Sequence, residues 1–262
     1  MNKPFFSIIV VSLNAENYIK NTIESVLKQS FEDYEIVVKD GLSKDKTLAQ
    51  IPKSDKIHIF EEKDSSIYDA MNQAIGHSNG KYLCFLNCGD YFENENVLKS
   101  IYETAKNCDD AIVYGNYSRK GILFKQPSVI TPFYLYRTPL CHQTMFFAKT
   151  LFDQKLYDTS YRILADYEHT LCDFKAGKPF VYVPVTVCDY MGEGVSENGK
   201  MRSIKKHEYK LIKEKYFSPA EIKKFRFMLS LSMKKLRQKM ISDSAPRWVR
   251  KLYRFAVNKV NK

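Results

Sequence analysis

The sequence has 262 residues, of which 44% are hydrophobic, so it can fill the core of one large α/β domain and does not belong to the fibrous or disordered classes. Its net charge of +11 is unevenly divided: residues 1–200 hold 22 Lys and Arg against 26 Asp and Glu, whereas residues 201–262 hold 19 against 4. We therefore expect a weakly acidic body over 1–200 and a basic extension over 201–262, each with its own partners.

The N-terminal residues show no features of a secretory leader. Their apolar run is short and lacks a small-residue cleavage site, and no stretch approaches the roughly 20 apolar residues that a membrane-spanning helix needs. The six cysteines are scattered without a C-x-x-C pair, so we expect reduced thiols. These features predict a cytoplasmic protein, in solution or on a membrane surface.

The first ninety residues alternate between strand and helix patterns. Residues 5–13 form a continuous apolar, β-rich run, and the apolar positions over 18–27 recur at helical spacing. The pattern continues with a strand over 35–40, a short helix over 46–51, a strand over 56–62, a helix over 67–75 capped by Asp64 or Ser65, and a strand over 81–87. This alternation is typical of a parallel sheet with right-handed crossovers.

Polar residues follow each of these four strands. They are Ser12 and Asn14, then Asp40, then Asp64, and finally the run Asn87-Cys88-Gly89-Asp90. Ligands of parallel α/β sheets bind beyond the carboxyl ends of the strands, so these side chains are expected to meet at one rim. One such Asp would be explained as a helix cap, but four polar strand ends in succession predict a binding site.

The later residues follow a less regular pattern. Strands are predicted over 111–117, 145–149 and 180–191, a helix with an acidic first turn over 163–177, and a polar glycine-containing loop over 192–199.

Four blocks of the sequence resemble the family 2 inverting glycosyltransferases with the GT-A fold. They are SIIVVSLNAENYIKNTIESVLKQSFEDYEIVVKDGLSKDKT (7–47), EKDSSIYDAMNQAIGHSNGKYLCFLNCGD (62–90), CHQTMFF (141–147) and LADYEH (164–169). Their order and spacing match. Within the second block, the segments IYDAMN (67–72) and LNCGD (86–90) are similar to segments of enzymes that make bacterial cell-surface polysaccharides. The resemblance implies a Rossmann-like, mostly parallel central sheet flanked by helices. It also implies transfer of a sugar from a nucleotide donor, with uridine as the family-level base, to a hydroxyl of a growing glycan, with inversion.

The resemblance also implies a divalent cation, Mg²⁺ or Mn²⁺, after the fourth strand. Asp90 matches the family position that coordinates this ion. Asn87 stands where many relatives have Asp and can offer only a neutral oxygen, and Cys88 separates it from the glycine. A buried strand before this turn would present Asp90 rigidly; without the resemblance the run reads as an ordinary turn.

The resemblance assigns the donor-binding residues to the ends of all four strands and to the block that follows the third strand. Asp40 matches the residue that hydrogen-bonds the base or ribose, and the block over 64–72 matches the segment along the diphosphate. The assigned set is Ser12, Asn14, Glu16, Asp40, Gly41, Ser43, Asp64, Asp69, Asn72, Asn87 and Cys88. Met71 stands where many relatives carry Arg, and Asp64 or Asp69 could equally be a cap or lie on a solvated helix face.

The resemblance places the general base at Asp166, with Glu168 as the reserve on the acceptor side. A carboxylate there would take the proton of the attacking hydroxyl, and a position in the first turn of a helix favours its ionised form. His142 matches a block that lines the acceptor pocket, and the loop over 192–199 resembles a lid. A capping role for Asp166 is the alternative.

The extension over 201–262 predicts two or three helices. Near its end, an apolar stripe that includes Trp248 is surrounded by Lys and Arg, which suits an anionic membrane surface and a glycan or lipid-linked acceptor. Packing of the stripe on the body or on a second subunit is the alternative, and nucleic acid is not expected.

Two other functions remain open from the sequence. A sugar-phosphate nucleotidyltransferase would need a Gly-rich basic loop near the N-terminus, and residues 12–18 contain none. A catalytically degenerate scaffold would explain Asn87 and Met71, but not the presence of all three of Asp40, Asp90 and Asp166.

Overall fold

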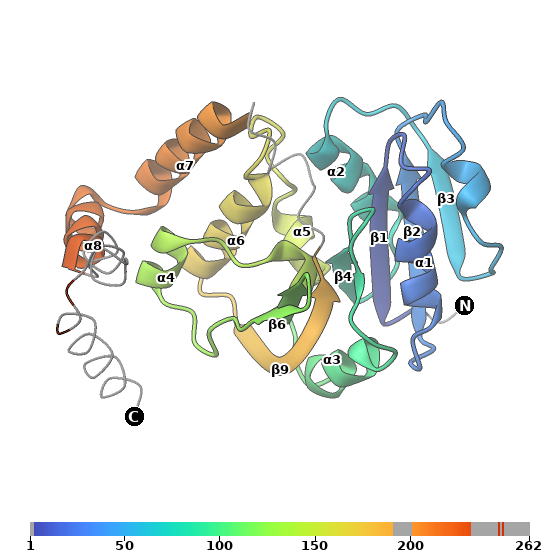
Figure 1. Cartoon of the computed structure of the whole chain (residues 1–262), viewed down its shortest axis with the longest axis horizontal. Coiled ribbons are helices and arrows are strands. Elements are labelled where there is room, and N and C mark those ends of the chain that lie inside the picture. Colours follow the sequence, from blue (N-terminus) through green and yellow to red (C-terminus); the bar gives the residue numbers. More distant parts are fainter. Residues whose placement is uncertain (1–2, 191–200, 232–245, 247, 249–262) are drawn as a thin grey trace. The chain divides into compact units, whose positions relative to one another are not determined.

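The computed structural model describes residues 3–190, 201–231, 246 and 248 (Figure 1). The chain divides into two compact units, Met1–Ile212 and Lys213–Lys262. The division falls inside a helix that begins at Arg202, so the first part of the basic extension belongs to the larger unit.

One half of the larger unit is a parallel α/β layer over residues 3–90, called the parallel half below. Its strands are β1 (Phe6–Ser12), β2 (Tyr34–Asp40), β3 (Ile57–Glu61) and β4 (Tyr82–Phe85), in the spatial order β3-β2-β1-β4. All three pairings are parallel, and Ser12 lies opposite Asp40 at the carboxyl ends. Its helices are α1 (Ile19–Leu27), the 3₁₀ turn η1 (Leu48–Gln50) and α2 (Ile67–His77).

The apolar runs of β1 and β2 are explained by burial on both faces. Every residue of these two strands is buried, whereas β3 at the sheet edge is partly exposed. Helices α1 and α2 each bury one apolar face. The parallel sheet with helical crossovers predicted from the sequence is confirmed.

The other half covers residues 91–212 and is called the mixed half. Its strands are β5 (Tyr91–Phe92), β6 (Ile112–Arg119), β7 (Ile122–Phe124), β8 (Met145–Ala148) and β9 (Phe180–Asp189). The sheet continues from β4 through β8, β6 and β9 to β5, and β7 pairs with β6. The β4–β8 and β8–β6 pairs are antiparallel and the β6–β9 pair is parallel, so strand direction changes where the two halves join.

Short helices connect and cover the mixed half. They are α3 (Val97–Ala105), α4 (Pro132–Arg137), the 3₁₀ turn η2 (His142–Thr144), α5 (Thr150–Gln154) and α6 (Ala165–Lys175). Figure 1 shows α6 next to α4 and away from the strands of the parallel half. The predicted strands over 111–117, 145–149 and 180–191 and the helix over 163–177 are present with shifted ends.

Three local predictions were wrong. The helix expected over 46–51 is only the turn η1, and the strand expected to run to residue 87 ends at Phe85. The cap of α2 is Ser66, since its backbone is extended and its side chain accepts from the Asp69 N–H, whereas Asp64 and Ser65 precede the helix. Ser66 therefore satisfies one of the first-turn N–H groups that no helical carbonyl can reach.

The basic extension contains α7 (Arg202–Tyr216) and α8 (Pro219–Leu231). Among the described residues, no helix is long and apolar enough to cross a membrane. The predicted lid loop over 192–199 and all of the apolar stripe except Trp248 lie outside the described residues. All six cysteines are free, as predicted.

Candidate active site

A cavity of about 990 Å³ lies where the two halves of the larger unit meet. The parallel half contributes the turn after β1, the start of α2 and the turn after β4. The mixed half contributes side chains from β6, β7, the segment around η2 and the start of α6, while α7 adds Lys205 and Tyr209. The predicted residues that line this cavity are Ser12, Asn14, Asp64, Asn87, Cys88, Asp90, His142 and Asp166.

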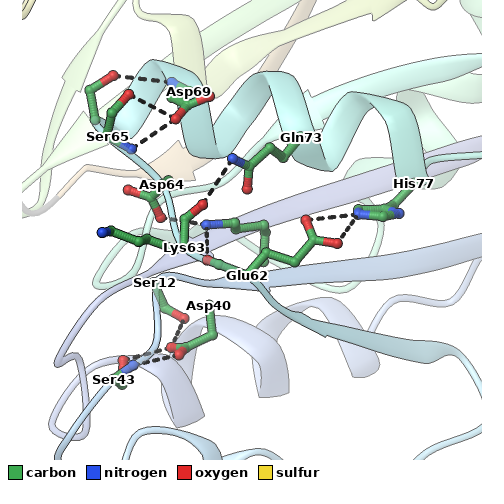
Figure 2. A network of polar contacts seen from close by, with 12 residues as sticks. Ser12, Asp40, Ser43, Glu62, Lys63, Asp64, Ser65, Asp69, Gln73 and His77 are labelled. Atoms are coloured by element: carbon green, nitrogen blue, oxygen red, sulfur yellow. Dashed lines mark hydrogen bonds and ion pairs between the residues drawn. The ribbon is translucent and has the colours of Figure 1, made fainter.

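Asp40 lies just behind this wall and is fully buried. Figure 2 shows its carboxylate between Ser12 and Ser43. One oxygen accepts from Ser12 Oγ at 2.9 Å and from Ser43 Oγ at 2.6 Å, and the other accepts from the Ser43 N–H at 2.7 Å. Asp40 thus fixes the carboxyl ends of β1 and β2, and Gly41 follows it directly in the chain.

The loops after β1 and β2 hydrogen-bond to each other. The Asn14 N–H donates to Ser43 Oγ at 2.8 Å, and the Asn14 side-chain oxygen accepts from the Lys44 N–H at 2.9 Å. The Glu16 carboxylate accepts from the Lys46 N–H at 2.9 Å. Asn14 also has a positive φ of 52°, a conformation that Asn adopts more readily than most residues. These side chains shape the loops that border the cavity.

A buried ion pair, which the sequence reasoning missed, fixes Asp64. Lys39 on β2 is fully buried, and its ammonium pairs with the Asp64 carboxylate and donates to the Glu62 carbonyl at 2.7 Å. A Cβ on Gly41 would come within 2.7 Å of the same carboxylate, so glycine is needed there for space. Lys39 therefore neutralises a carboxylate that borders the cavity. The only sequence signal was a lysine directly after the apolar run 36–38 of β2.

Residues at the start of α2 have two different roles: some hold the helix in place and others line the cavity. Figure 2 shows Asp69 turned toward Ser65, whose N–H and hydroxyl both donate to it at 2.8 Å. These bonds lower the pKa of Asp69. Asn72 exchanges two hydrogen bonds with the backbone of Tyr157 at 2.9 and 3.0 Å. Both residues position α2, while Asp64, Ala70 and Met71 line the cavity.

The turn after β4 presents Asp90 to the cavity. Gly89 has a φ of +99°, where a side chain would strain the backbone, and its N–H donates to Thr22 Oγ1 at 2.9 Å. Asp90 is 5% exposed and accepts from Gln143 Nε2 at 3.0 Å. Burial raises the pKa of the Cys88 thiol to about 12, and the negative charges of Asp40 and Asp90 act in the same direction. Cys88 is therefore a neutral thiol.

The donor set at this turn fits a cation that shares its ligands with a substrate. Among the described residues, no three His, Cys, Asp or Glu side chains are grouped to hold a metal ion by themselves. Asp90 supplies one hard oxygen, and Asn87 lines the same cavity with an amide. Mg²⁺ is commonly bound by one or two carboxylates plus substrate phosphates, so a single carboxylate is sufficient for an ion that arrives with a diphosphate.

Asp166 lies in the first turn of α6 and is tied to the parallel half through Tyr68. The Tyr68 hydroxyl is 2.7 Å from the Asp166 carboxylate and 2.6 Å from the Ile163 carbonyl. Tyr68 is buried, and burial with the nearby Asp166 charge raises its pKa well above the usual value, so it stays a donor. A helix of the parallel half thus orients the candidate base of the mixed half.

His142 and Glu168 occupy different environments. His142 lines the cavity, and its buried Nε2 has no hydrogen-bond partner within the described residues. Burial lowers its pKa. Glu168 is fully buried, and both its oxygens lie 2.6 Å from the Lys155 ammonium. Glu168 is outside the cavity, so the structure places the two predicted acceptor residues apart.

Glu208 of α7 was also missed by the sequence reasoning. It is buried, and its carboxylate accepts from the N–H groups of Arg162, Ile163 and Leu164 at 2.7, 3.1 and 3.0 Å. It therefore fixes the segment that enters α6 and positions Asp166. The signal was weak: Glu208 is one of only four acidic residues in a strongly basic segment.

Positive charge reaches the cavity from the mixed half. Arg162, Lys125 and Lys205 line it, although none was selected from the sequence. Since Lys39 already neutralises Asp64, these three cations offset the carboxylates of Asp90 and Asp166, so the cavity can receive an anionic ligand. Tyr18 and Leu13 line the cavity as well and expose 45% and 59% of their surface.

The profile of the family described as Glycosyl transferase family 2 matches residues 7–164. A PGL/p-HBAD biosynthesis glycosyltransferase of Mycobacterium bovis is 29% identical over 199 residues, which cover 72% of this chain and 78% of the relative. A putative teichuronic acid biosynthesis glycosyltransferase of Bacillus subtilis, TuaG, is 36% identical over 104 residues, covering 38% and 41%.

Solved structures show the same fold at low identity. S. aureus TarS 1–349 in complex with UDP-GlcNAc has a TM-score of 0.62 and 16% identity, covering 91% of this chain and 76% of TarS. A mannosyltransferase of Pyrobaculum calidifontis in complex with GDP-Man and Mn²⁺ has a TM-score of 0.64 and 14% identity, covering 100% and 81%. The predicted GT-A fold is confirmed.

Proposed function

The chain belongs to glycosyl transferase family 2, and we propose that it moves one sugar from a nucleotide donor to a hydroxyl of a growing cell-envelope glycan with inversion. The observation that supports this most is the composition of one cavity. Strand-end residues of the parallel half, Ser12, Asp64 and Asp90, share it with Asp166 of the mixed half. An inverting transfer needs a donor-binding side and, facing it, a side that carries the general base.

In this proposal the donor lies against the parallel half. Asp40 fixes the nucleoside loops, and Asp64 offers a carboxylate whose position Lys39 maintains. Tyr18 and Leu13 are exposed apolar side chains against which a base can pack. Relatives of this fold bind UDP-GlcNAc and GDP-Man, which supports a sugar nucleotide as donor, with UDP as our choice.

Asp90 would hold a divalent cation, with Asn87 as a neutral neighbour. The structural relative with Mn²⁺ supports an ion of this class, Mg²⁺ or Mn²⁺. When bound, such an ion neutralises the diphosphate and helps it to leave. Arg162, Lys125 and Lys205 add positive charge from the chain itself.

Asp166 acts as the general base in the proposed mechanism. Its carboxylate takes the proton of the acceptor hydroxyl as that oxygen attacks the anomeric carbon from the side opposite the leaving diphosphate. Tyr68 positions this carboxylate through its hydroxyl, and Glu208 positions it by holding the segment before α6. His142, with an uncommitted Nε2 within the described residues, is available to a hydroxyl of the acceptor.

We also propose that residues 1–200 carry the catalytic groups, positioned in part by Glu208, and that the basic extension over 201–262 contacts an anionic membrane surface. Its 19 Lys and Arg against 4 acidic residues support this contact. The protein would then work at the inner face of the cytoplasmic membrane on a glycan or a lipid-linked saccharide.

The donor site is tested by thermal unfolding with a panel of nucleoside diphosphates, with and without Mn²⁺ or Mg²⁺. A ligand that binds only the native state at a hundred times its Kd adds about 2.7 kcal/mol of stability. We expect stabilisation by one nucleotide only when the metal is present. Asp90→Ala should lose it, and the exposed control Asp55→Ala should keep it.

The same experiment decides between an enzyme and a degenerate scaffold. A scaffold has no reason to bind sugar nucleotides, so a panel without any stabilisation would reject the donor site. A stabilisation that is unchanged in Asp90→Ala would reject the metal assignment but retain the nucleotide site.

A further inference from the structure

The β6–β7 hairpin exposes an apolar edge beside the cavity. All three side chains of β7 are exposed: Ile122 at 62%, Leu123 at 48% and Phe124 at 40%. Among the described strands, β7 pairs only with β6, so its outer edge is unpaired. Val129, which follows the hairpin, is 71% exposed. Single exposed apolar residues are ordinary, but four of them within residues 122–129 indicate an interaction surface.

The chain segment that contains this apolar edge carries only positive charge, and Glu93 accepts a hydrogen bond from Ser118 where the hairpin leaves the sheet. The hairpin is flanked by Arg119, Lys120 and Lys125, and Arg137 ends α4. No Asp or Glu occurs between Ala111 and Phe152, although residues 1–200 as a whole are weakly acidic. Apolar tips with cationic flanks suit the interface of an anionic lipid bilayer, where the tips enter the acyl boundary and the cations meet the headgroups.

The charges argue against a second copy of the chain as the occupant. Pairing of two β7 edges would bring Lys120 and Lys125 of one copy close to cations of the other. Lysines on an exposed edge strand are a known means of preventing such pairing. A bilayer satisfies both the apolar and the cationic side chains.

The hairpin also forms part of the cavity. Phe124 and Lys125 line it together with Tyr134 of α4, and the Phe124 ring stacks on Tyr117 with centroids 5.0 Å apart. A bilayer at this edge would face the acceptor side of the cavity. A lipid-linked acceptor could then enter without leaving the membrane.

We propose that the β6–β7 hairpin, residues 119–129, docks on an anionic lipid bilayer. This contact is on the catalytic body and is separate from the basic extension. The delivery of a lipid-linked acceptor by this docking rests on the proposed function, whereas the docking itself does not.

The first test places a fluorophore in the hairpin of the full-length protein. The chain has a single tryptophan, so Leu123→Trp in a Trp248→Phe background reports only on β7. Vesicles of phosphatidylcholine with phosphatidylglycerol should shift its emission to the blue, and brominated lipid should quench it. Vesicles of phosphatidylcholine alone should do neither. Ile59→Trp, at an apolar position 43% exposed on β3, is the matched control and should not respond.

A charge reversal gives the second test. Lys120→Glu should lower partitioning into anionic vesicles roughly 25-fold, since each unit of charge near such a surface contributes about a fivefold factor and the substitution changes the charge by two units. The exposed Lys53→Glu, which has the same net charge, should lower it much less. Stabilisation by nucleotides should be the same in both variants, so failure of docking and failure of the donor site are distinguishable.

Three results would overturn the proposal. Anionic vesicles could bind the protein without any response of Leu123→Trp, which would assign binding to the extension alone. Lys120→Glu could behave as Lys53→Glu. A concentration-dependent dimer that is lost in Ile122→Ser would instead assign the edge to a second copy.

Discussion

The parallel and mixed halves of the larger unit build their sides of the cavity in different ways. In the parallel half, polar side chains satisfy one another across adjacent strand ends, as Asp40 does with Ser12 and Ser43. In the mixed half, Asp166 is positioned by residues far away in the chain, Tyr68 and Glu208. The parallel side is therefore held by neighbouring strands of one sheet, whereas the mixed side depends on packing between separate elements. Substitutions should separate the two.

Asp166→Asn should have the largest effect and leave the parallel half intact. Loss of a general base typically costs 10²–10⁴ in turnover, so we expect kcat to fall by about a thousandfold. Stabilisation by the nucleotide should be unchanged. Turnover at saturating donor, measured beside nucleotide-dependent unfolding, tests both statements.

Glu168→Gln is the comparison for this variant, because Glu168 is the other carboxylate of the same helix turn. It should affect stability through Lys155 more than turnover. If transfer persisted in Asp166→Asn and was lost in Glu168→Gln, then Glu168, and not Asp166, would be the general base.

Asp64→Asn should be the most destabilising change in the parallel half. It leaves the ammonium of Lys39, which is fully buried, without its charged partner. Breaking a buried pair costs about 3–5 kcal/mol, and the double variant Lys39→Met/Asp64→Asn should recover part of this loss. Chemical denaturation gives the free energies of unfolding. If the single variant were as stable as the wild type, the pair would have no structural role.

Tyr68→Phe should weaken the link between the halves. The variant loses a hydroxyl that donates toward the Asp166 carboxylate, and hydrogen bonds to charged groups contribute about 1.5–3 kcal/mol. We expect at least a tenfold loss in kcat with little change in donor affinity.

Tyr157→Phe is the matched control. Tyr157 is buried beside Tyr68, with ring centroids 5.6 Å apart, but its hydroxyl has no hydrogen-bond partner within the described residues. Removing that hydroxyl should leave turnover nearly unchanged. Equal losses in the two variants would show that aromatic packing, rather than the contact with Asp166, is what matters.

His142→Gln should have the smallest effect, seen in the pH dependence of stability. Burial lowers the pKa of His142 in the folded state below its ordinary 6.5. The unfolded chain therefore binds this proton first, and the folded state loses stability as pH falls below about 6.5.

Unfolding free energies at pH 7.5 and pH 5.5 should differ less in His142→Gln than in the wild type, by about 1 kcal/mol. The exposed His207→Gln should behave as the wild type. An unchanged pH difference in His142→Gln would mean that this ring is not held neutral.

Much of the parallel half could be predicted because its signals are local. Continuous apolar runs identified β1 and β2, and polar residues directly after them identified the rim. Eight of the residues selected from the sequence line one cavity. Their roles in binding and catalysis remain predictions.

The residues that escaped prediction act over long sequence distances. Lys39 is separated from Asp64 by 25 positions, and Glu208 from Leu164 by 44. No periodicity links such pairs. The cations of the cavity were missed for the same reason, since Arg162 and Lys205 lie outside any strand-end pattern. Asp69 and Asn72 were selected beside Asp64, but their hydrogen bonds hold α2 in place.

The bonds between the loops after β1 and β2 have a consequence for how donor preference can diverge. The side chains of Asn14, Glu16 and Ser43 already accept hydrogen bonds from the backbone N–H groups of Lys44, Lys46 and Asn14, respectively. A substitution at one of these three positions would change the shape of both loops at once. We expect selection to remove most such substitutions before they change which sugar nucleotide the site prefers. Leu13 and Tyr18 carry no such constraint from side-chain hydrogen bonds to these loops, yet they border the same cavity. If the proposed donor site is correct, we expect variation at these two positions to be an accessible route to a new donor.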